Sequence, residues 1–162
     1  MLEAVQAPHG GLLDLGASLV TLAGQAELTG SIALGVAIAR LRHRRRDWIV
    51  PLAIAVVVLI ESVLKIVVPQ LPPPADRSRS VALIPSLEVP FGNSFPSGHV
   101  ARSVFLLVAL RAPALLALVG IAIMALTRVY LADHWPSDVV GGLLLGAGVA
   151  WAVSVDRRRR TA

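Results

Sequence analysis

The chain contains no cysteine, and only 4% of its residues are aromatic. The absence of cysteine excludes disulfides and thiolate metal sites. Because aromatic residues are so few, the hydrophobic fraction of 56% is mainly aliphatic, as in helices that face lipid. The mean hydropathy is +0.74, and a soluble domain of 162 residues cannot bury that much apolar surface. The composition therefore predicts an integral membrane protein with one membrane-embedded domain over residues 1–162.

Apolar runs place four of the predicted membrane spans after residue 47. A transmembrane helix needs about 20 mainly apolar residues, or fewer where the bilayer thins. Residues 48–68 form the clearest run, and residues 139–155 form the last. Between them, residues 95–131 are apolar but interrupted by Arg111 and Pro113, which predicts two short passes joined by a tight turn.

The first apolar run, residues 12–39, is too long for one pass and is interrupted by Gly24, Gln25 and Glu27. We expect an interfacial helix over residues 12–22 and the first span at about residues 26–39. The predicted fold is therefore all-α: a bundle of about five transmembrane helices preceded by an N-terminal interfacial helix.

Basic residues set the predicted orientation. With five spans, most of the 15 Lys and Arg residues lie on one side, which the excess of positive charge makes cytoplasmic. The N-terminus is then outside the cell membrane and the C-terminus cytoplasmic. Binding of nucleic acid is disfavoured, because both main basic clusters adjoin helix ends. The residues on the cytoplasmic side are Arg40, Arg42, Arg44, Arg45, Arg46, Arg111, Arg157, Arg158, Arg159 and Arg160.

The remaining basic residues are predicted to lie at or near the outer face: Lys65, Arg77, Arg79, Arg102 and Arg128. Charge placed where membrane insertion disfavours it is a functional hypothesis by default. We therefore expect the outer side to bind an anion.

The segment Pro96-Ser97-Gly98-His99 opens one of the short passes. Proline suits a first helical turn, where its missing N–H leaves nothing unpaired, and a helix start offers free N–H groups to an anion. Gly98 lets the backbone approach a ligand closely, and Ser97 adds a hydroxyl donor. This segment is therefore a candidate phosphate site.

A second polar segment precedes the last predicted span. His134 and Asp138 are four residues apart, so at a helix start they share a face, and the carboxylate would orient the imidazole. Lys65 and Arg128 supply positive charge, and arginine suits the geometry of phosphate oxygens. Two histidines, one with a carboxylate partner, together with cations predict a phosphoryl-transfer site that uses no metal and no cofactor.

These motifs resemble the type 2 phosphatidic acid phosphatase superfamily. The PSGH segment at residues 96–99 and the later pattern Arg-x5-His-x3-Asp, from Arg128 to Asp138, are similar to the second and third signature motifs of that family. The resemblance covers residues 65–138. It implies a membrane lipid phosphatase, with vanadium haloperoxidases as soluble and larger relatives that fit this chain poorly.

The resemblance also implies roles for individual residues. His134 would attack phosphorus and form a phosphohistidine while Asp138 holds it, and His99 would protonate the leaving oxygen and then activate water. The phosphate oxygens would be bound by Lys65, Ser97, the Gly98 N–H and Arg128.

The first motif departs from the family pattern. That pattern is Lys-x6-Arg-Pro, whereas Lys65 is followed seven positions later by Pro72 and then Pro73. We hypothesise that Arg77 or Arg79, beyond the PPP segment, supplies the missing guanidinium. The departure also keeps a second function open, a lipid-phosphate binding or transport protein that does not hydrolyse its ligand.

As an enzyme, the protein is expected to act on a polyprenyl diphosphate, with phosphatidate and phosphatidylglycerophosphate as close alternatives. A polyprenyl-linked sugar phosphate is a further possibility. The expected partners are thus a lipid phosphate and the bilayer, and no nucleic acid.

Several other polar residues have simpler structural interpretations. Glu61 precedes Lys65 by four residues, which predicts an intrahelical ion pair, with a role in catalysis as the less favoured alternative. Arg102 is expected to pair with Glu61, and attraction of anions is its alternative role. Asp133 is expected to cap the last helix. His9 and His43 are expected at the surface. The glycines of the last span are expected to allow close packing within one bundle: Gly141, Gly142, Gly146 and Gly148.

Overall fold

The structure of the chain is a computed structural model that describes residues 2–7, 10–81, 83 and 92–161. All regular secondary structure in these ranges is helical, which confirms the predicted all-α class. His9 lies outside the described residues, and His43 is exposed as expected.

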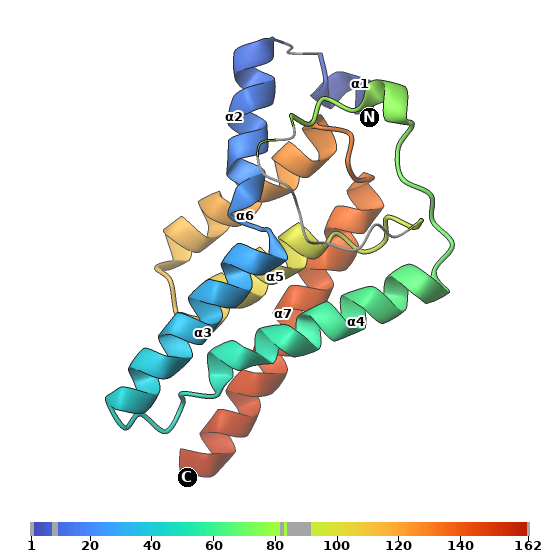
Figure 1. Cartoon of the computed structure of the whole chain (residues 1–162). Helices are drawn as coiled ribbons and strands as arrows, with labels where there is room; N and C mark the ends of the chain where they lie inside the picture. Colours follow the sequence, from blue (N-terminus) through green and yellow to red (C-terminus); the bar gives the residue numbers. More distant parts are fainter. Residues whose placement is uncertain (1, 8–9, 82, 84–91, 162) are drawn as a thin grey trace.

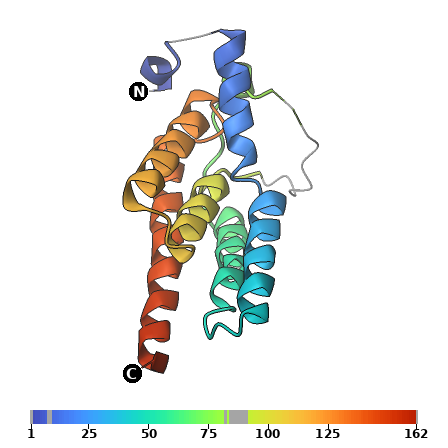
Figure 2. The ribbon, with the colours of Figure 1, turned by 90° about the vertical axis from the view of Figure 1, so that its left-hand side faces the viewer.

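The helices follow one another with short connections. In chain order they are α1 (Leu2–Val5), α2 (Gly11–Leu22), α3 (Ala26–Arg42), the 3-10 helix η1 (Val50–Ala53), α4 (Ile54–Val67), the 3-10 helix η2 (Ala75–Arg77), α5 (Gly98–Ala109), α6 (Ala114–Tyr130) and α7 (Pro136–Thr161). Successive helices from α3 to α7 alternate in direction, as Figures 1 and 2 show. The end of α6 and the starts of α5 and α7 therefore meet at one end of the bundle, and the C-terminus lies at the other.

Helix α5 is the most enclosed part of the bundle, and it packs closely against α7. The Cα atoms of Gly142 and Gly146 lie against the carbonyl oxygens of Ser97 and Ala101, where any added Cβ would collide with backbone. Phe105 and Val57 are fully buried in the adjoining core. Gly141, Gly142 and Gly146 thus pack within the bundle as predicted. Gly148 does not, because it is exposed and has nothing within 4 Å of an added Cβ.

Length and composition identify fewer spans than the sequence predicts. Val50–Val67 and Pro136–Ser154 are long and apolar enough to cross a membrane, and α2 with α3 forms a third candidate that is bent by 40°. Helices α5 and α6 have only 12 and 17 residues. All the predicted segments are helical, but five spans remain a prediction.

Helix α5 begins at Gly98, three residues later than the predicted pass. The Ser97 N–H donates to the Asp138 carbonyl at 2.9 Å, so the preceding residues follow α7 instead of extending the helix. Pro96 therefore lies before the first helical turn, not in it as predicted. At about 1.5 Å per residue, α5 is about 18 Å long, shorter than α4, α6 and α7.

Helix α2 precedes α3, is bent from it by 40°, and packs against α6. The Tyr130 hydroxyl donates to Asp14 Oδ1 at 2.6 Å, and the Val81 N–H donates to Ser18 Oγ at 3.0 Å. On its other side, Leu12 and Leu19 are exposed. One face of α2 is therefore polar and bound to the bundle, and the other is apolar.

Candidate active site

His134 and Asp138 form a buried pair where α7 begins. His134 Nδ1 lies 3.2 Å from Asp138 Oδ2, and the same oxygen accepts the Trp135 N–H at 2.9 Å. Asp138 is fully buried. With Nδ1 protonated toward the carboxylate, His134 Nε2 keeps its lone pair. The contact predicted from the four-residue spacing is therefore present.

Gln70 also contacts this carboxylate, and sequence reasoning missed it. Its Nε2 atom donates to Asp138 Oδ1 at 2.6 Å and lies 2.8 Å from Ser137 Oγ. The Gln70 backbone is fixed in turn, because its carbonyl accepts the Ser94 N–H at 2.7 Å. The only sequence signal was its position in the first-motif segment, five residues after Lys65.

Ser97 has unused hydrogen-bonding capacity immediately before α5. Its side chain is fully buried, and Oγ has no hydrogen-bond partner among the described residues. Buried hydroxyl groups are normally hydrogen-bonded, so an orphaned one beside a helix start indicates a ligand position. The segment that the sequence predicts as a phosphate site is therefore arranged to receive an acceptor atom.

Cationic side chains surround His99. Its imidazole interacts electrostatically with Arg128, Arg102, His134 and Lys65. These groups come from the end of α4, the start of α5, the end of α6 and the loop before α7. The fold thus gathers both histidines and two of the predicted phosphate-binding cations at one end of the bundle, whereas the sequence separates them by up to 69 positions (134 − 65).

Glu61 pairs with two of these cations. Its carboxylate oxygens lie 3.3 Å from Lys65 Nζ and 2.7 Å from Arg102 Nη1, so both predicted pairs are confirmed. Arg102 also donates from Nε to the Gly24 carbonyl at 3.0 Å. The Glu61 carboxylate lies directly against Gly98, where any side chain would overlap it. The close approach that glycine allows at position 98 is therefore made by Glu61.

Asp133 does not cap α7, so that prediction was wrong. Its Oδ2 atom lies 3.1 Å from Arg128 Nη1, and both carboxylate oxygens accept from the Ser80 hydroxyl. The first-turn amide of the α7 region is bound by Asp138 instead. Arg128 and Ser80 together give the Asp133 carboxylate more partners than a single backbone amide would, which accounts for the difference.

Arg79 contacts the last residue of α6, Tyr130. Its guanidinium carbon is 5.4 Å from the centre of the Tyr130 ring, and Nη1 is 3.4 Å from the Tyr130 hydroxyl. The Arg77 carbonyl accepts from Gln6 at 3.0 Å. The hypothesis that one of these arginines completes the phosphate site remains a prediction.

The surroundings of His134 favour its neutral form. Burial lowers the pKa of His134 most strongly, and the positive charge of Arg128 lowers it further. The hydrogen bond that His134 donates to Asp138 opposes both effects but leaves the pKa below the ordinary value of 6.5. Groups of three or more His, Asp or Glu side chains suited to a metal do not occur in the described part of the chain.

The comparisons with known proteins identify the family. Residues 46–162 match the model of the PAP2 superfamily, and the chain belongs to that superfamily. This confirms the resemblance drawn from the motifs, because PAP2 denotes the type 2 phosphatidic acid phosphatases.

Two curated relatives and two solved structures are similar to the chain. The decaprenylphosphoryl-5-phosphoribose phosphatases of two Mycobacterium tuberculosis strains, CDC 1551 and H37Rv, are each 36% identical over 129 residues, or 75% of this chain. The match spans only 64% of the length of those relatives.

Both similar structures come from membrane phosphatases or their relatives. A transmembrane PAP2 type phosphatidylglycerolphosphate phosphatase from Bacillus subtilis has a TM-score of 0.78 and 20% identity, covering 98% of this chain and 83% of its own. LpxE from Aquifex aeolicus has a TM-score of 0.70 and 21% identity, covering 94% and 91%. The chain is therefore a membrane protein with the PAP2 fold.

Proposed function

We propose that the protein is a lipid phosphatase that acts at the extracytoplasmic face of the cell membrane through a phosphohistidine on His134. The observation that carries the proposal is the buried His134–Asp138 pair, at 3.2 Å, beside the unpartnered Ser97 hydroxyl and the cations around His99. A nucleophile with an orienting carboxylate, next to donors for an anion, is suited to phosphoryl transfer.

The first chemical step forms a bond between His134 Nε2 and phosphorus. The bond from phosphorus to the ester oxygen breaks, and His99 donates a proton to that leaving oxygen. Asp138 stabilises the imidazolium through Nδ1. Because positive charge accumulates on His134 only as the bond forms, a fixed carboxylate lowers the barrier.

The second step releases phosphate. Water attacks the phosphohistidine, His99 accepts the water proton, and the bond between phosphorus and Nε2 breaks, which regenerates neutral His134. Lys65, Arg128, the Ser97 hydroxyl and the Gly98 N–H bind the oxygens whose charge grows in the transition state. No step requires a metal or a cofactor.

The substrate class we favour is a phosphorylated polyprenyl lipid. The Mycobacterium tuberculosis relatives are phosphatases of decaprenylphosphoryl-5-phosphoribose, a polyprenyl-linked sugar phosphate, and the 36% identity supports a related substrate for this chain. Polyprenyl diphosphate, phosphatidate and phosphatidylglycerophosphate are the alternatives to compare, the last because of the Bacillus subtilis fold relative.

The proposal is tested by phosphate release from these four lipids, using purified protein in detergent with EDTA. Turnover that vanadate inhibits and that His134→Ala abolishes is expected. Because the first-motif arginine is missing, the competing function is a protein that binds lipid phosphates without hydrolysing them. Lipid phosphates that bind tightly without release of phosphate would establish that function instead.

A further inference from the structure

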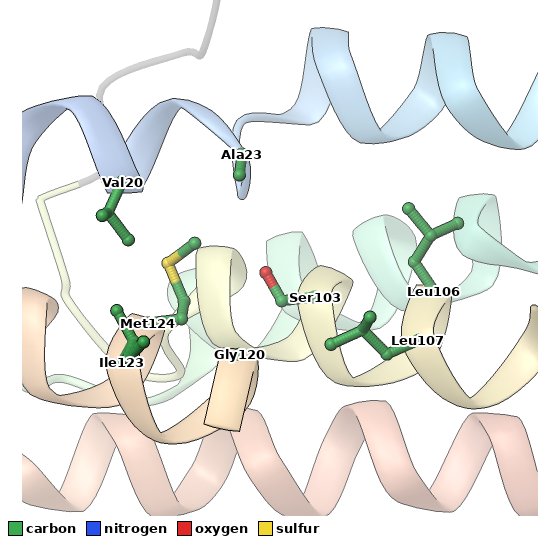
Figure 3. A pocket seen from close by; sticks show the side chains of 8 residues that line it. All are labelled: Val20, Ala23, Ser103, Leu106, Leu107, Gly120, Ile123 and Met124. Atoms are coloured by element: carbon green, nitrogen blue, oxygen red, sulfur yellow. The ribbon is translucent and has the colours of Figure 1, made fainter. Parts of the chain in front are cut away.

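An apolar groove of about 270 Å³ lies between the end of α2 and the helices α5 and α6. In Figure 3, Val20 and Ala23 line it from α2, Ser103 and Leu107 from α5, and Gly120 and Met124 from α6. Ser103 is the only polar side chain among its lining residues. The chemistry of this lining suits a hydrocarbon and offers little to a polar headgroup.

The α5 wall of the groove continues from the candidate active site. His99, Ser103 and Leu106 are separated by four and three residues, so they lie along one face of the helix. Each step descends about one turn, or roughly 5 Å, from the helix start. The groove therefore begins one turn below the imidazole that is proposed to protonate the leaving oxygen.

The α6 wall shows the same relation. Arg128, Met124 and Gly120 succeed one another at four-residue intervals toward the other end of the bundle. Helices α5 and α6 are antiparallel, so both walls lead from the phosphate-binding residues in the same direction.

The end of α2 closes the groove near the active site. Ala23 lines the groove, and the next residue, Gly24, lies against His99, where an added Cβ would be 2.9 Å from the His99 Cβ. The groove and the active site are thus separated only by the thickness of the backbone and the His99 side chain.

We propose that this groove binds the part of the substrate's hydrocarbon chain nearest to the phosphate. This inference rests on the proposed function, and it makes the substrate a lipid whose chain enters between α5 and α6. At the roughly 30 Å³ that a water-sized group occupies, the volume holds about nine methylene groups, which is enough for one chain and not for two. A single-chain polyprenyl lipid therefore fits better than a diacyl lipid.

Gly120→Leu tests the groove through catalysis. A Cβ at Gly120 would lie 3.6 Å from Leu107 Cδ1, an ordinary contact, so the larger side chain projects into the groove without striking backbone. The KM for a long polyprenyl phosphate is expected to rise at least about tenfold, as loss of contact with a few methylene groups implies. Hydrolysis of water-soluble isopentenyl phosphate is expected to stay within about twofold.

Gly148→Leu is the matched control. Gly148 lies on α7 with nothing within 4 Å of an added Cβ, so this variant adds the same side chain outside the groove. Equal losses on both substrates in Gly120→Leu, or unchanged values on both, would overturn the proposal. If the unmodified protein hydrolyses neither substrate, the proposed function has failed, and the groove is then tested by ligand binding alone.

A single introduced thiol supplies that binding test, because the chain has no cysteine of its own. In a His134→Ala background, which keeps the ligand intact, Ser103→Cys reports occupancy of the groove. Long polyprenyl phosphate is expected to slow its alkylation by N-ethylmaleimide about fivefold or more when the lipid is in several-fold excess over its Kd. Inorganic phosphate is expected to have no effect.

Val108→Cys is the control for this measurement. Val108 lies on the same helix with 46% of its surface exposed, and it does not line the groove. Protection at Ser103→Cys but not at Val108→Cys supports the groove. The same alkylation rate with and without lipid at Ser103→Cys, or equal protection at both positions, would show that the chain binds elsewhere.

Discussion

At the scale of single residues, the site depends on how completely the Asp138 carboxylate is held. Its two oxygens accept from Gln70, from the Trp135 backbone and from His134. A carboxylate with all of these partners has one orientation, so the His134 ring has one as well. In the proposed mechanism, that fixed orientation positions Nε2 for attack on phosphorus.

The pH dependence of catalysis follows from His134. Only the neutral imidazole attacks, and because burial lowers the pKa of His134, the acid limb of kcat/KM is expected below pH 6.5. Asp138→Asn replaces the charged acceptor that raises the pKa of His134 with a neutral amide, so the limb should move to still lower pH while kcat falls about 100-fold or more. Measurements of kcat and kcat/KM from pH 4 to 8 give the position of the acid limb and the fall in kcat. An acid limb above pH 6.5 in the unmodified protein would contradict this assignment.

Gln70 is expected to act as a positioning residue. Gln70→Ala removes one donor from Asp138, which should lower kcat about tenfold and leave KM nearly unchanged, since a hydrogen bond to a charged group contributes about 1.5–3 kcal/mol. Ser137→Ala is the control, because Ser137 contacts Gln70 but not the carboxylate oxygens that Gln70 holds. A change in KM with kcat intact would instead indicate contact with substrate.

Alanine substitution tests whether Arg77 or Arg79, the two arginines beyond the PPP segment, completes the phosphate site. If one completes the phosphate site, its alanine variant should lower kcat/KM about 100-fold, the range for loss of a donor to a developing anion. Arg79→Ala also removes the contact with Tyr130, so Tyr130→Phe is assayed beside it to isolate the effect of the hydroxyl. Near-normal turnover in both Arg77→Ala and Arg79→Ala would exclude the hypothesis.

Some of these residues were predictable from the sequence, and others were not. The His134–Asp138 contact follows from helical spacing, as does the Glu61–Lys65 pair. Gln70 was not predictable, because its amide meets Asp138 only after the segment following α4 folds back against α7. Asp133 was misassigned for a related reason, since its partners, Arg128 and Ser80, come from different elements.

At the scale of elements, the packing of α5 on α7 sets the distance between the histidines. Gly142 and Gly146 bring the two backbones together, and the Ser97 N–H bonds the Asp138 carbonyl across the contact. The sequence predicted that these glycines allow close packing. The sequence did not reveal that α5 would begin at Gly98. That boundary depends on the hydrogen bond from the Ser97 N–H to the Asp138 carbonyl, two residues far apart in the sequence.

Gly146→Ala is expected to destabilise the bundle. The added Cβ would collide with the Ala101 carbonyl, which cannot move independently of α5, so the variant should lose about 1–3 kcal/mol. Gly148→Ala, with open space around its Cβ, is the control and should match or exceed the unmodified protein. Thermal unfolding in detergent measures both, and equal midpoints would contradict the packing described here.

At the scale of the whole molecule, the order of helices places all the proposed catalytic residues at one end. The end of α4, the starts of α5 and α7 and the end of α6 are brought together only if the chain reverses direction at the turn after Ala109. The sequence indicated this reversal through Arg111 and Pro113. It could not fix the number of membrane crossings, because α5 and α6 are shorter than ordinary spans.

The predicted orientation is measured with single cysteines in the cysteine-free chain. Ser80→Cys lies in the loop at the active-site end and should react with a membrane-impermeant maleimide in intact cells. His43→Cys lies beyond α3 at the opposite end and should react only after permeabilisation. Both positions are exposed, so the maleimide reagent can reach either one once it is on the same side of the membrane. The reverse labelling pattern would place the active site in the cytoplasm and overturn the predicted topology.

The main-chain hydrogen bond between Ser97 and Asp138 makes the geometry of the site independent of the side chains that face lipid. The spacing of the reacting groups is fixed by backbone atoms, which few substitutions disturb, whereas the lipid-facing sides of α5 and α6 are defined by side chains alone. On the proposed function, substitutions on those sides are therefore expected to change which lipid is accepted while the chemistry stays the same. Relatives that share this frame would then diverge in substrate by altering a few membrane-facing positions, with the histidines left in place.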